Sequence, residues 1–195
     1  YGRILAEYPY IPSFRKKKLD NYLMIDGLEN LEKIKKNKKP ALFISGHFNN
    51  FELMAMTIER EGVDLFAVYR PLNNKFLNLI MEYLRKKFVC QNQIKKGING
   101  VREAIVYLKK GFSIALMIDQ RVSEGEKINF FGKPALTTTL PAQLALKYNL
   151  SICPVHIERT NENNFIIRFL DEIKTSDFKG KIDVTEKLNQ VLEQM

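Results

Sequence analysis

Two residues with the chemistry of a general base and its supporting acid lie five positions apart. His47, one of only two histidines in the chain, follows the apolar run Ala41 to Ile44, which predicts a buried strand. Glu52 lies within an amphipathic run (Phe51, Met54, Ile58) that predicts a helix. A histidine that removes a proton from a hydroxyl needs one free ring nitrogen, while the other donates to a carboxylate that fixes its tautomer. The pattern therefore predicts acid–base chemistry with His47 as the base.

The position of His47 between a strand and a helix favours a binding role. The strand ends at Ser45-Gly46, a turn signal, so the imidazole lies at the carboxyl end of the strand, where open α/β sheets bind their ligands. Residues five apart on one helix are about 140° out of register, so His47 must precede the helix for Glu52 to reach it. We expect the helix over 48–61, with N-terminal amides that suit a developing oxyanion.

Two other charged residues directly follow predicted strands. Arg70 follows the strand expected at 63–69, and Asp119 follows the one expected at 112–118. If these strands are parallel, both side chains lie at the same end of the sheet as His47. A guanidinium there can bind a phosphate. Asp119 is either a second carboxylate that orients His47 or an acid that holds an arginine.

Each of these residues also has a simpler structural interpretation. His47 can be an ordinary core or surface histidine, as His156 in the middle of a predicted strand is expected to be. Glu52 suits the positive end of a helix dipole, and Asp119 suits a turn. Arg70 can be a surface arginine. A serine nucleophile is not expected, because Ser45 lies outside a G-x-S-x-G motif.

The elements that would position these side chains alternate between strand and helix. Besides the three strands above, helices are expected over 73–88, around 101–108, over 140–148 and over 182–194, with a short strand at 22–25 and a short helix at 28–34. The runs 151–159 and 165–170, joined by the polar segment 160–164, predict an antiparallel hairpin. Residues 119–139 are expected to be a polar loop. This order predicts an α/β fold with a mainly parallel central sheet flanked by helices and an antiparallel hairpin at one edge.

Five blocks in this order resemble a known family. Gly46-His-Phe-Asn-Asn-Phe-Glu52 resembles the H-x-x-x-x-[DE] block of the lysophospholipid acyltransferase superfamily, and most of all its bacterial lipid A late acyltransferases. One departure is Asn49-Asn50-Phe51, where the family usually shows Gly-Asn-Trp. The resemblance covers about residues 20 to 195, and its other blocks are Val68-Tyr69-Arg70-Pro71, Ile118-Asp119-Gln120, Phe130-Phe131-Gly132-Lys133-Pro134-Ala135, and Cys153-Pro154-Val155 with Arg159 behind.

The resemblance implies an acyl transfer and its participants. The donor would be an acyl carrier protein thioester (or acyl-CoA), and the acceptor a hydroxyl of a phosphorylated glycolipid, the Kdo-bearing lipid A precursor. His47 would be the base, oriented by Glu52 or Asp119, and no cofactor or metal is implied. Substrate binding would fall to Arg70, Asn50, Gln120 and Arg159. The protein would act at a membrane surface, on the cytoplasmic face of the inner membrane.

The composition fits one basic domain. The chain has 195 residues, 45% of them hydrophobic, and a net charge of +9, with lysines in clusters such as Arg15 to Lys18 and Lys33 to Lys39. Such clusters suit anionic lipid surfaces, phosphorylated substrates, acidic carrier proteins or nucleic acid, although a solvated helix face has the same composition. With two cysteines and two histidines, a zinc site is not expected. We expect 1–195 to be a single acyltransferase domain, and a fragment lacking an N-terminal membrane anchor and a C-terminal segment.

Two alternatives remain open at this stage. One is a related acyltransferase with another acceptor, such as a lysophospholipid, a mannosylated lipid or an ornithine lipid, because the H-x-x-x-x-E block does not separate these. The other is a basic nucleic-acid-binding domain. Aromatic residues are not interleaved with the lysine clusters as in a stacking platform, so nucleic acid is not expected as a partner.

Overall fold

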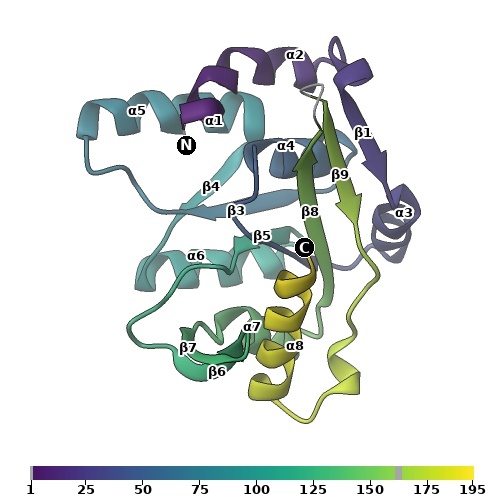
Figure 1. Cartoon of the computed structure of the whole chain (residues 1–195), viewed down its shortest axis with the longest axis vertical. Helices are drawn as coiled ribbons and strands as arrows, with labels where there is room; N and C mark the ends of the chain where they lie inside the picture. The colour runs from purple at the N-terminus through teal and green to yellow at the C-terminus, as the bar shows by residue number, and fades with distance from the viewer. Residues whose placement is uncertain (1, 161–163) are drawn as a thin grey trace.

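The computed structural model describes residues 2–160 and 164–195, which form a seven-stranded sheet between two layers of helices (Figure 1). The strand order is β1-β9-β8-β2-β5-β3-β4, and a separate two-stranded sheet joins β6 and β7. The strands are β1 (Leu23–Asp26), β2 (Ala41–Ser45), β3 (Leu65–Tyr69), β4 (Asn92–Lys95), β5 (Ser113–Met117), β6 (Glu126–Phe130), β7 (Lys133–Thr137), β8 (Ser151–Arg159) and β9 (Phe165–Phe169).

The helices connect these strands and cover the sheet. Within the described residues the α-helices are α1 (Gly2–Glu7), α2 (Ile11–Arg15), α3 (Leu28–Asn37), α4 (Glu52–Arg60), α5 (Lys75–Leu84), α6 (Ile98–Lys109), α7 (Leu140–Tyr148) and α8 (Lys181–Gln194). A π-helical segment, η3 (Arg85–Val89), continues α5, and short 3-10 turns are η1 (Tyr8–Tyr10), η2 (Asp20–Tyr22) and η4 (Thr175–Asp177).

The predicted mainly parallel sheet is confirmed. β2 is parallel to both β5 and β8, and β3 is parallel to both β5 and β4. β8 and β9 pair antiparallel, as the hairpin signal indicated, and β1 adds a parallel strand outside β9. Residues 161–163 of the predicted hairpin connection lie outside the described residues. The strands whose carboxyl ends carry predicted site residues, β2, β3, β5 and β8, therefore all point the same way. β8 continues to Arg159, beyond its last pairing with β2 at Pro154.

Two hydrophobic cores lie on opposite faces of the sheet. On β2, Phe43 packs into one core, with residues of α2, α3 and α4, while Leu42 and Ile44 pack into the other, with residues of α6, α7 and α8. Side chains of a strand alternate between the two faces, so a continuous apolar run marks a strand that is covered on both sides. α4 follows β2 in the chain, so the loop that joins them begins at the carboxyl end of β2.

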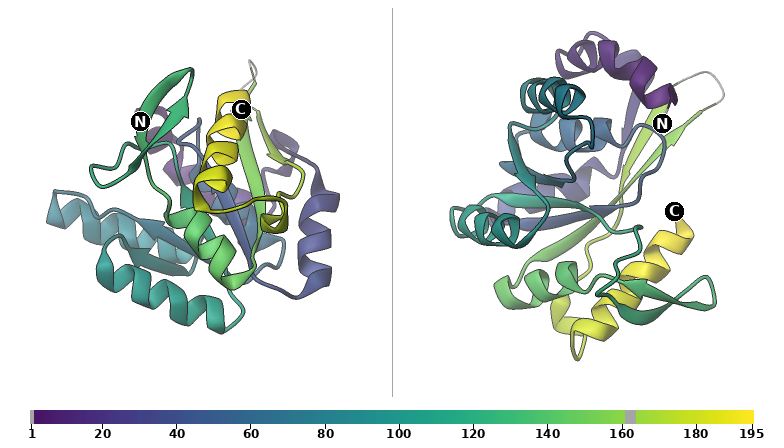
Figure 2. Two further views of the ribbon diagram at one scale, coloured as in Figure 1. Left: turned by 90° about the horizontal axis from the view of Figure 1, so that it is seen from below. Right: turned by 90° about the vertical axis from the view of Figure 1, so that its left-hand side faces the viewer.

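The segment 119–139, predicted to be a polar loop, contains the β6–β7 hairpin instead. Ile128 is the buried residue of β6, and its neighbours on the strand are polar, which is why no strand was expected there. The hairpin rests on α8, where Asn189 Nδ2 donates to the carbonyl oxygen of Asn129 at 2.8 Å (Figure 2). β4 was also unpredicted, because its polar sequence carries one buried apolar residue, Ile94.

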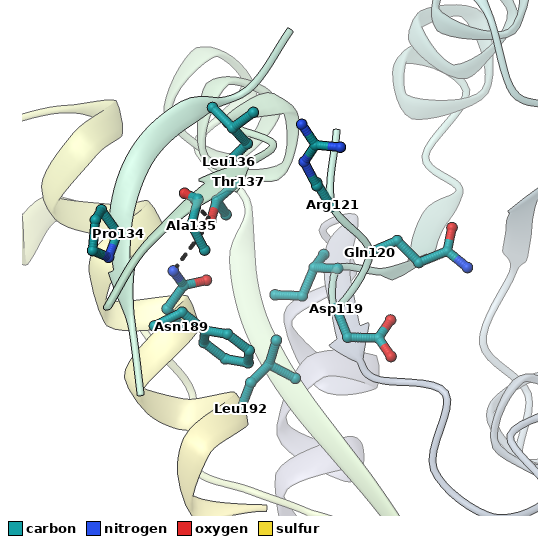
Figure 3. A pocket seen from close by; sticks show the side chains of 11 residues that line it. Asp119, Gln120, Arg121, Pro134, Ala135, Leu136, Thr137, Asn189 and Leu192 are labelled. Atoms are coloured by element: carbon teal, nitrogen blue, oxygen red, sulfur yellow. Dashed lines mark hydrogen bonds between the residues drawn. The ribbon is translucent and has the colours of Figure 1, made fainter. Parts of the chain in front are cut away.

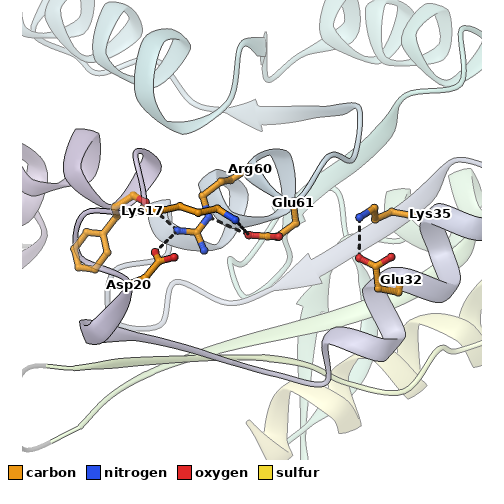
Figure 4. Close-up of polar contacts among 7 residues, drawn as sticks. Lys17, Asp20, Glu32, Lys35, Arg60 and Glu61 are labelled. Carbon is orange, nitrogen blue, oxygen red and sulfur yellow. Dashed lines mark hydrogen bonds and ion pairs between the residues drawn. The ribbon is translucent and has the colours of Figure 1, made fainter.

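The N-terminal segment is attached to α4 by Arg60 (Figure 4). Its guanidinium donates to the carbonyl oxygen of Phe14 at 2.9 Å and to Asp20 Oδ1 at 2.7 Å, and it pairs with Glu61 at 3.1 Å. Lys17 adds an ion pair to Glu61 at 3.6 Å. These contacts hold α2 and the segment that follows it against α4, the helix that begins at Glu52. Within the described part of the chain, no helix combines the length and apolar character that crossing a membrane requires.

Candidate active site

His47 and Asp119 come from neighbouring parallel strands and lie at the same edge of the sheet. β2 and β5 are paired so that Ser45 is opposite Met117, and each of the two side chains lies two residues beyond that pair. The backbone N–H of Ile118 donates to the carbonyl oxygen of Ser45 at 2.9 Å, which extends the pairing toward the site. The register of the sheet thus brings these two residues together although they are 72 positions apart.

Asp119 binds His47 at two points. Its Oδ1 lies 2.7 Å from Nδ1 of the imidazole, and its Oδ2 accepts the backbone N–H of His47 at 2.8 Å. Partial burial alone would raise the pKa of Asp119, but the hydrogen bonds from the ring and backbone of His47 lower it below its usual value. An ionised carboxylate only accepts hydrogen bonds, so in the neutral imidazole the proton lies on Nδ1 and Nε2 is free to accept one.

A tight turn between β2 and α4 carries the imidazole. Asn49 adopts a left-handed backbone conformation, with φ of 41°, which Asn tolerates better than most residues. The ring of Phe51 packs edge-on against that of His47, with centroids 4.9 Å apart. α4 begins at Glu52 rather than at residue 48 as predicted, so residues 48–51 belong to the turn. The ring is therefore held by Asp119 and Phe51, ahead of the helix.

Glu52 is bound to residues other than His47. Its side chain is buried, with the residue 5% exposed, and Oε1 accepts the hydroxyl of Tyr8 at 2.6 Å and both Nε and Nη2 of Arg85 at 2.9 and 2.6 Å. Of the two carboxylates that were expected as alternatives to orient His47, Asp119 contacts the ring and Glu52 contacts Tyr8 and Arg85 instead. The reason is that a buried carboxylate requires a compensating charge, and Arg85 of η3 supplies it.

In the cluster of Tyr8, Glu52 and Arg85, the tyrosine hydroxyl keeps its proton and the arginine keeps its positive charge. Burial raises the pKa of the Tyr8 hydroxyl, and the adjacent Glu52 charge raises it further, so the hydroxyl remains a donor. Burial acts to lower the pKa of Arg85, but the Glu52 carboxylate outweighs it and raises that pKa. The result is a charged arginine held in a fixed position by two hydrogen bonds.

One cavity beside His47 is largely apolar and is called the apolar cavity here. It has a volume of about 340 Å³, within the usual range for ligand sites. Its polar lining comes from His47, Glu52, Arg70, Arg85 and Gln120, together with Tyr69, Gln93, Lys96 and Thr138. Its apolar lining comes from Phe51, Ala55, Ala67, Val68, Val89, Ala115, Leu116, Met117, Ile118, Val122, Leu140 and Pro141. Hydrocarbon fits such walls, and cations at the rim suit an anionic group.

A second cavity reaches His47 from the N-terminal helix and is called the basic cavity here. It measures about 420 Å³ and is lined by Gly2, Arg3, Ile4, His47, Asn49 and Arg159. His47 thus lines both cavities. A third cavity of about 320 Å³ lies on the far side of Asp119, between Gln120, Arg121 and the β6–β7 hairpin with α8 (Figure 3).

Two residues predicted to bind substrate, Asn50 and Arg159, have a partner within the protein, Glu7. Asn50 is 1% exposed, donates from Nδ2 to Glu7 Oε2 at 2.8 Å and lines neither cavity beside His47. Arg159 forms an ion pair with Glu7 and also lines the basic cavity. Arg70 and Gln120, in contrast, lie at the apolar cavity as their positions after β3 and β5 indicated.

Three residues of the site were not predicted from the sequence. Glu7 and Tyr8 lie in a segment without clear periodicity, and Arg85 appeared only as part of a basic cluster with Lys86 and Lys87. The buried position of Glu52 demands a cationic partner, which accounts for Arg85 but not for Glu7 or Tyr8. Nothing in the sequence indicates which cation that is.

Comparison with known proteins identifies a family and a shared fold. A family model described as "Bacterial lipid A biosynthesis acyltransferase" matches residues 1–195. A search of curated protein sequences finds no match. Among solved structures, the chain is similar to the 1-acyl-sn-glycerophosphate (LPA) acyltransferase PlsC from Thermotoga maritima, with a TM-score of 0.55 and 14% identity. That similarity covers 96% of this chain and 77% of the other, and it shows that the two share a fold.

Proposed function

The chain belongs to the bacterial lipid A biosynthesis acyltransferase family, and from this premise we propose that it transfers a fatty acyl chain from an acyl carrier protein thioester to a hydroxyl of a Kdo-bearing lipid A precursor. The acyltransferase activity is that of the family, as the sequence blocks predicted. The observation that supports the detailed proposal is the position of His47, which is oriented by Asp119 and lines two cavities of different character.

The two cavities suit the two substrates. The walls of the apolar cavity fit the acyl chain and its thioester, and Arg70 and Lys96 at the same cavity suit the phosphate of the carrier's prosthetic group. The basic cavity, with Arg3 and Arg159, suits a phosphorylated acceptor. In this arrangement the acceptor hydroxyl approaches the thioester across the imidazole.

The proposed reaction is a direct transfer. Nε2 of His47 removes the proton from the acceptor hydroxyl, while Asp119 stabilises the imidazolium that forms. The oxygen attacks the thioester carbonyl and forms a tetrahedral intermediate with an oxyanion. Arg85, charged and fixed by Glu52, lines the same cavity and is placed to stabilise negative charge there. The C–S bond breaks, an ester forms, and the thiolate receives the proton from His47.

The expected place of action is the cytoplasmic face of the inner membrane, where a soluble acyl donor meets a lipid acceptor. This location follows from the two substrates proposed. It is tested together with them, by asking whether the protein copurifies with inner membranes and modifies the acceptor present there.

Mass spectrometry of the lipid product tests the substrates. The chain is incubated with an acyl carrier protein thioester and the Kdo-bearing precursor in detergent, in parallel with acyl-CoA and with lysophosphatidic acid. One added acyl chain on the precursor, absent with a folded His47→Ala variant, is the expected result. Acylation of lysophosphatidic acid but not of the precursor would contradict the acceptor assignment and favour the lysophospholipid alternative.

A further inference from the structure

Helix α5 is turned so that its polar side faces the protein and its apolar side faces outward. None of its residues is buried, and Phe76 and Leu79 are 72% and 67% exposed. With the preceding Leu72 and with Ile80 and Tyr83, which are also exposed, they recur at spacings of three and four residues and form one stripe. These five residues are called the α5 stripe here. A surface helix of a soluble domain normally points such a stripe at the core.

The inward side of α5 is fixed by hydrogen bonds rather than by apolar contacts. Glu82 accepts the hydroxyl of Tyr69 at 2.5 Å and the Nδ2 of Asn78 at 2.7 Å, and pairs with Lys95 at 3.2 Å. Asn74 caps the helix by accepting the backbone N–H of Leu77 at 3.1 Å. The helix is therefore anchored in this orientation, with its stripe exposed. α5 itself lies at the periphery of the molecule (Figure 1).

The surroundings of the stripe are strongly basic. Between residues 70 and 100 the sequence has seven Lys or Arg residues and a single carboxylate, Glu82, which is directed inward. Lys75, Lys86 and Lys87 flank the stripe and are exposed. Lys87 Nζ lies 2.8 Å from the Tyr83 hydroxyl and over the rings of Tyr83 and Phe88. Aromatic and basic side chains that adjoin an apolar stripe are typical of a helix that lies in a membrane interface.

We propose that the α5 stripe, with Lys75, Lys86 and Lys87, docks onto an anionic lipid bilayer. An aqueous surface leaves about five large apolar side chains in water, whereas the interface buries them and pairs the lysines with lipid phosphates. The functional role of this docking, though not the docking itself, rests on the proposed function. Arg85 and Val89, which directly continue α5, line the apolar cavity, and Tyr69, bound to Glu82, lines it too. Docking of α5 would therefore hold that cavity against the lipid surface.

Vesicle sedimentation of the 195-residue chain tests the proposal without requiring turnover. Phosphatidylcholine vesicles with and without phosphatidylglycerol are compared for the wild type, a Phe76→Ser/Leu79→Ser variant and a Lys86→Glu/Lys87→Glu variant. We expect the first variant to bind anionic vesicles at least about tenfold more weakly, from the loss of two apolar side chains. The second should lose the preference for anionic vesicles. Because these side chains are exposed, both variants should keep the circular dichroism and melting temperature of the wild type.

Matched controls lie at the opposite edge of the sheet. Met24→Ser on β1 removes another apolar side chain that is 56% exposed, and Lys36→Glu/Lys39→Glu changes two exposed lysines at α3. Both controls should bind as the wild type does. Binding by the Phe76→Ser/Leu79→Ser variant equal to wild type, or no binding by the wild type, would overturn the proposal. So would a wild-type dimer that this variant dissociates with vesicle binding unchanged, because a second copy of the chain would then cover the stripe.

The result for membrane docking can be distinguished from the result for the proposed acyl transfer. On an acceptor dispersed in detergent, the Phe76→Ser/Leu79→Ser variant should transfer acyl chains as fast as the wild type, and it should be slower only on acceptor embedded in vesicles. If the wild type transfers nothing to the lipid A precursor, the proposed function fails while the sedimentation result still decides the role of α5. Weak binding of an acyl carrier protein by the same variant, with normal vesicle binding, would reassign the stripe to a protein partner.

Discussion

His47 is attached to one carboxylate through both its ring and its backbone, and this fixes the turn as well as the tautomer. Because Asp119 Oδ2 accepts the backbone N–H, rotation of the loop would break the ring contact too. A base held in this way needs little reorganisation during proton transfer. Glu52, in the sequence position where the motif places an acid, instead holds Arg85 in the wall of the apolar cavity.

Glu52→Gln is expected to lower the free energy of unfolding by about 3 kcal/mol, because it leaves the partly buried Arg85 without a compensating charge. Urea unfolding followed by circular dichroism measures this. Glu124→Gln, which changes an exposed carboxylate, is the matched control and should stay within about 0.5 kcal/mol of wild type. Equal stability of wild type and Glu52→Gln would show that the pair contributes nothing to the fold.

At the scale of elements, the reliable predictions were those in which a single pattern decides the structure. β2, β5 and β8 are apolar runs covered on both faces, so their sequences identify them without knowledge of the partners. Asp119 was placed at the edge of the sheet near His47 because parallel strands align their carboxyl ends. The β6–β7 hairpin was missed because Ile128 is the buried apolar residue of β6 and its neighbours on the strand are polar. The Tyr8–Glu52–Arg85 cluster was missed because its members meet only after the helices pack.

The stabilisation that Glu82 gives by joining α5 to Tyr69 of β3 should depend on pH. Hydrogen bonds from Tyr69 and Asn78 lower the pKa of Glu82 to about 2, from an ordinary value of 4.5. A depressed carboxyl pKa stabilises the folded state above pH 4.5, and this contribution disappears as the pH falls to about 2. Glu82→Gln should therefore lower the unfolding free energy by about 1 kcal/mol at neutral pH.

Unfolding of Glu82→Gln and wild type across this pH range checks the prediction. The difference in unfolding free energy should be constant above pH 4.5 and should vanish toward pH 2. Glu103→Gln, an exposed change on α6, serves as the comparison and should show no such trend. A difference between wild type and Glu82→Gln that persists undiminished at the acid end would mean that the charge of Glu82 is not what stabilises the contact.

At the scale of the whole molecule, His47 separates two cavities that are formed by different parts of the chain. The apolar cavity lies among β3, β5, α4 and η3, whereas the basic cavity is closed by α1 and the end of β8. The N-terminal segment therefore contributes to the site as well as to the fold. Tyr8 contacts Glu52, Glu7 contacts Asn50 and Arg159, and Arg3 lines the basic cavity. In the proposed function, each cavity binds one of the two substrates.

Kinetics of two arginine variants test the assignment of the cavities. Arg3→Gln should raise the KM for the acceptor by about tenfold and leave the KM for the acyl donor unchanged, because a single phosphate contact of this kind contributes roughly 1.5 kcal/mol. Arg70→Gln should do the reverse. Both side chains are exposed, so neither change should alter the melting temperature. A parallel rise of both KM values in either variant would contradict separate donor and acceptor cavities.

The most direct test of the account compares kcat for His47→Ala, Asp119→Asn and Glu52→Gln in the transfer assay. If Asp119 orients the base, Asp119→Asn should lower kcat by about 10³-fold or more, approaching the residual rate of His47→Ala. Glu52→Gln, assayed where it remains folded, should retain a much larger kcat. The account would be contradicted if Asp119→Asn kept nearly full activity while Glu52→Gln fell to the level of His47→Ala, since Glu52 would then be the acid that serves the base.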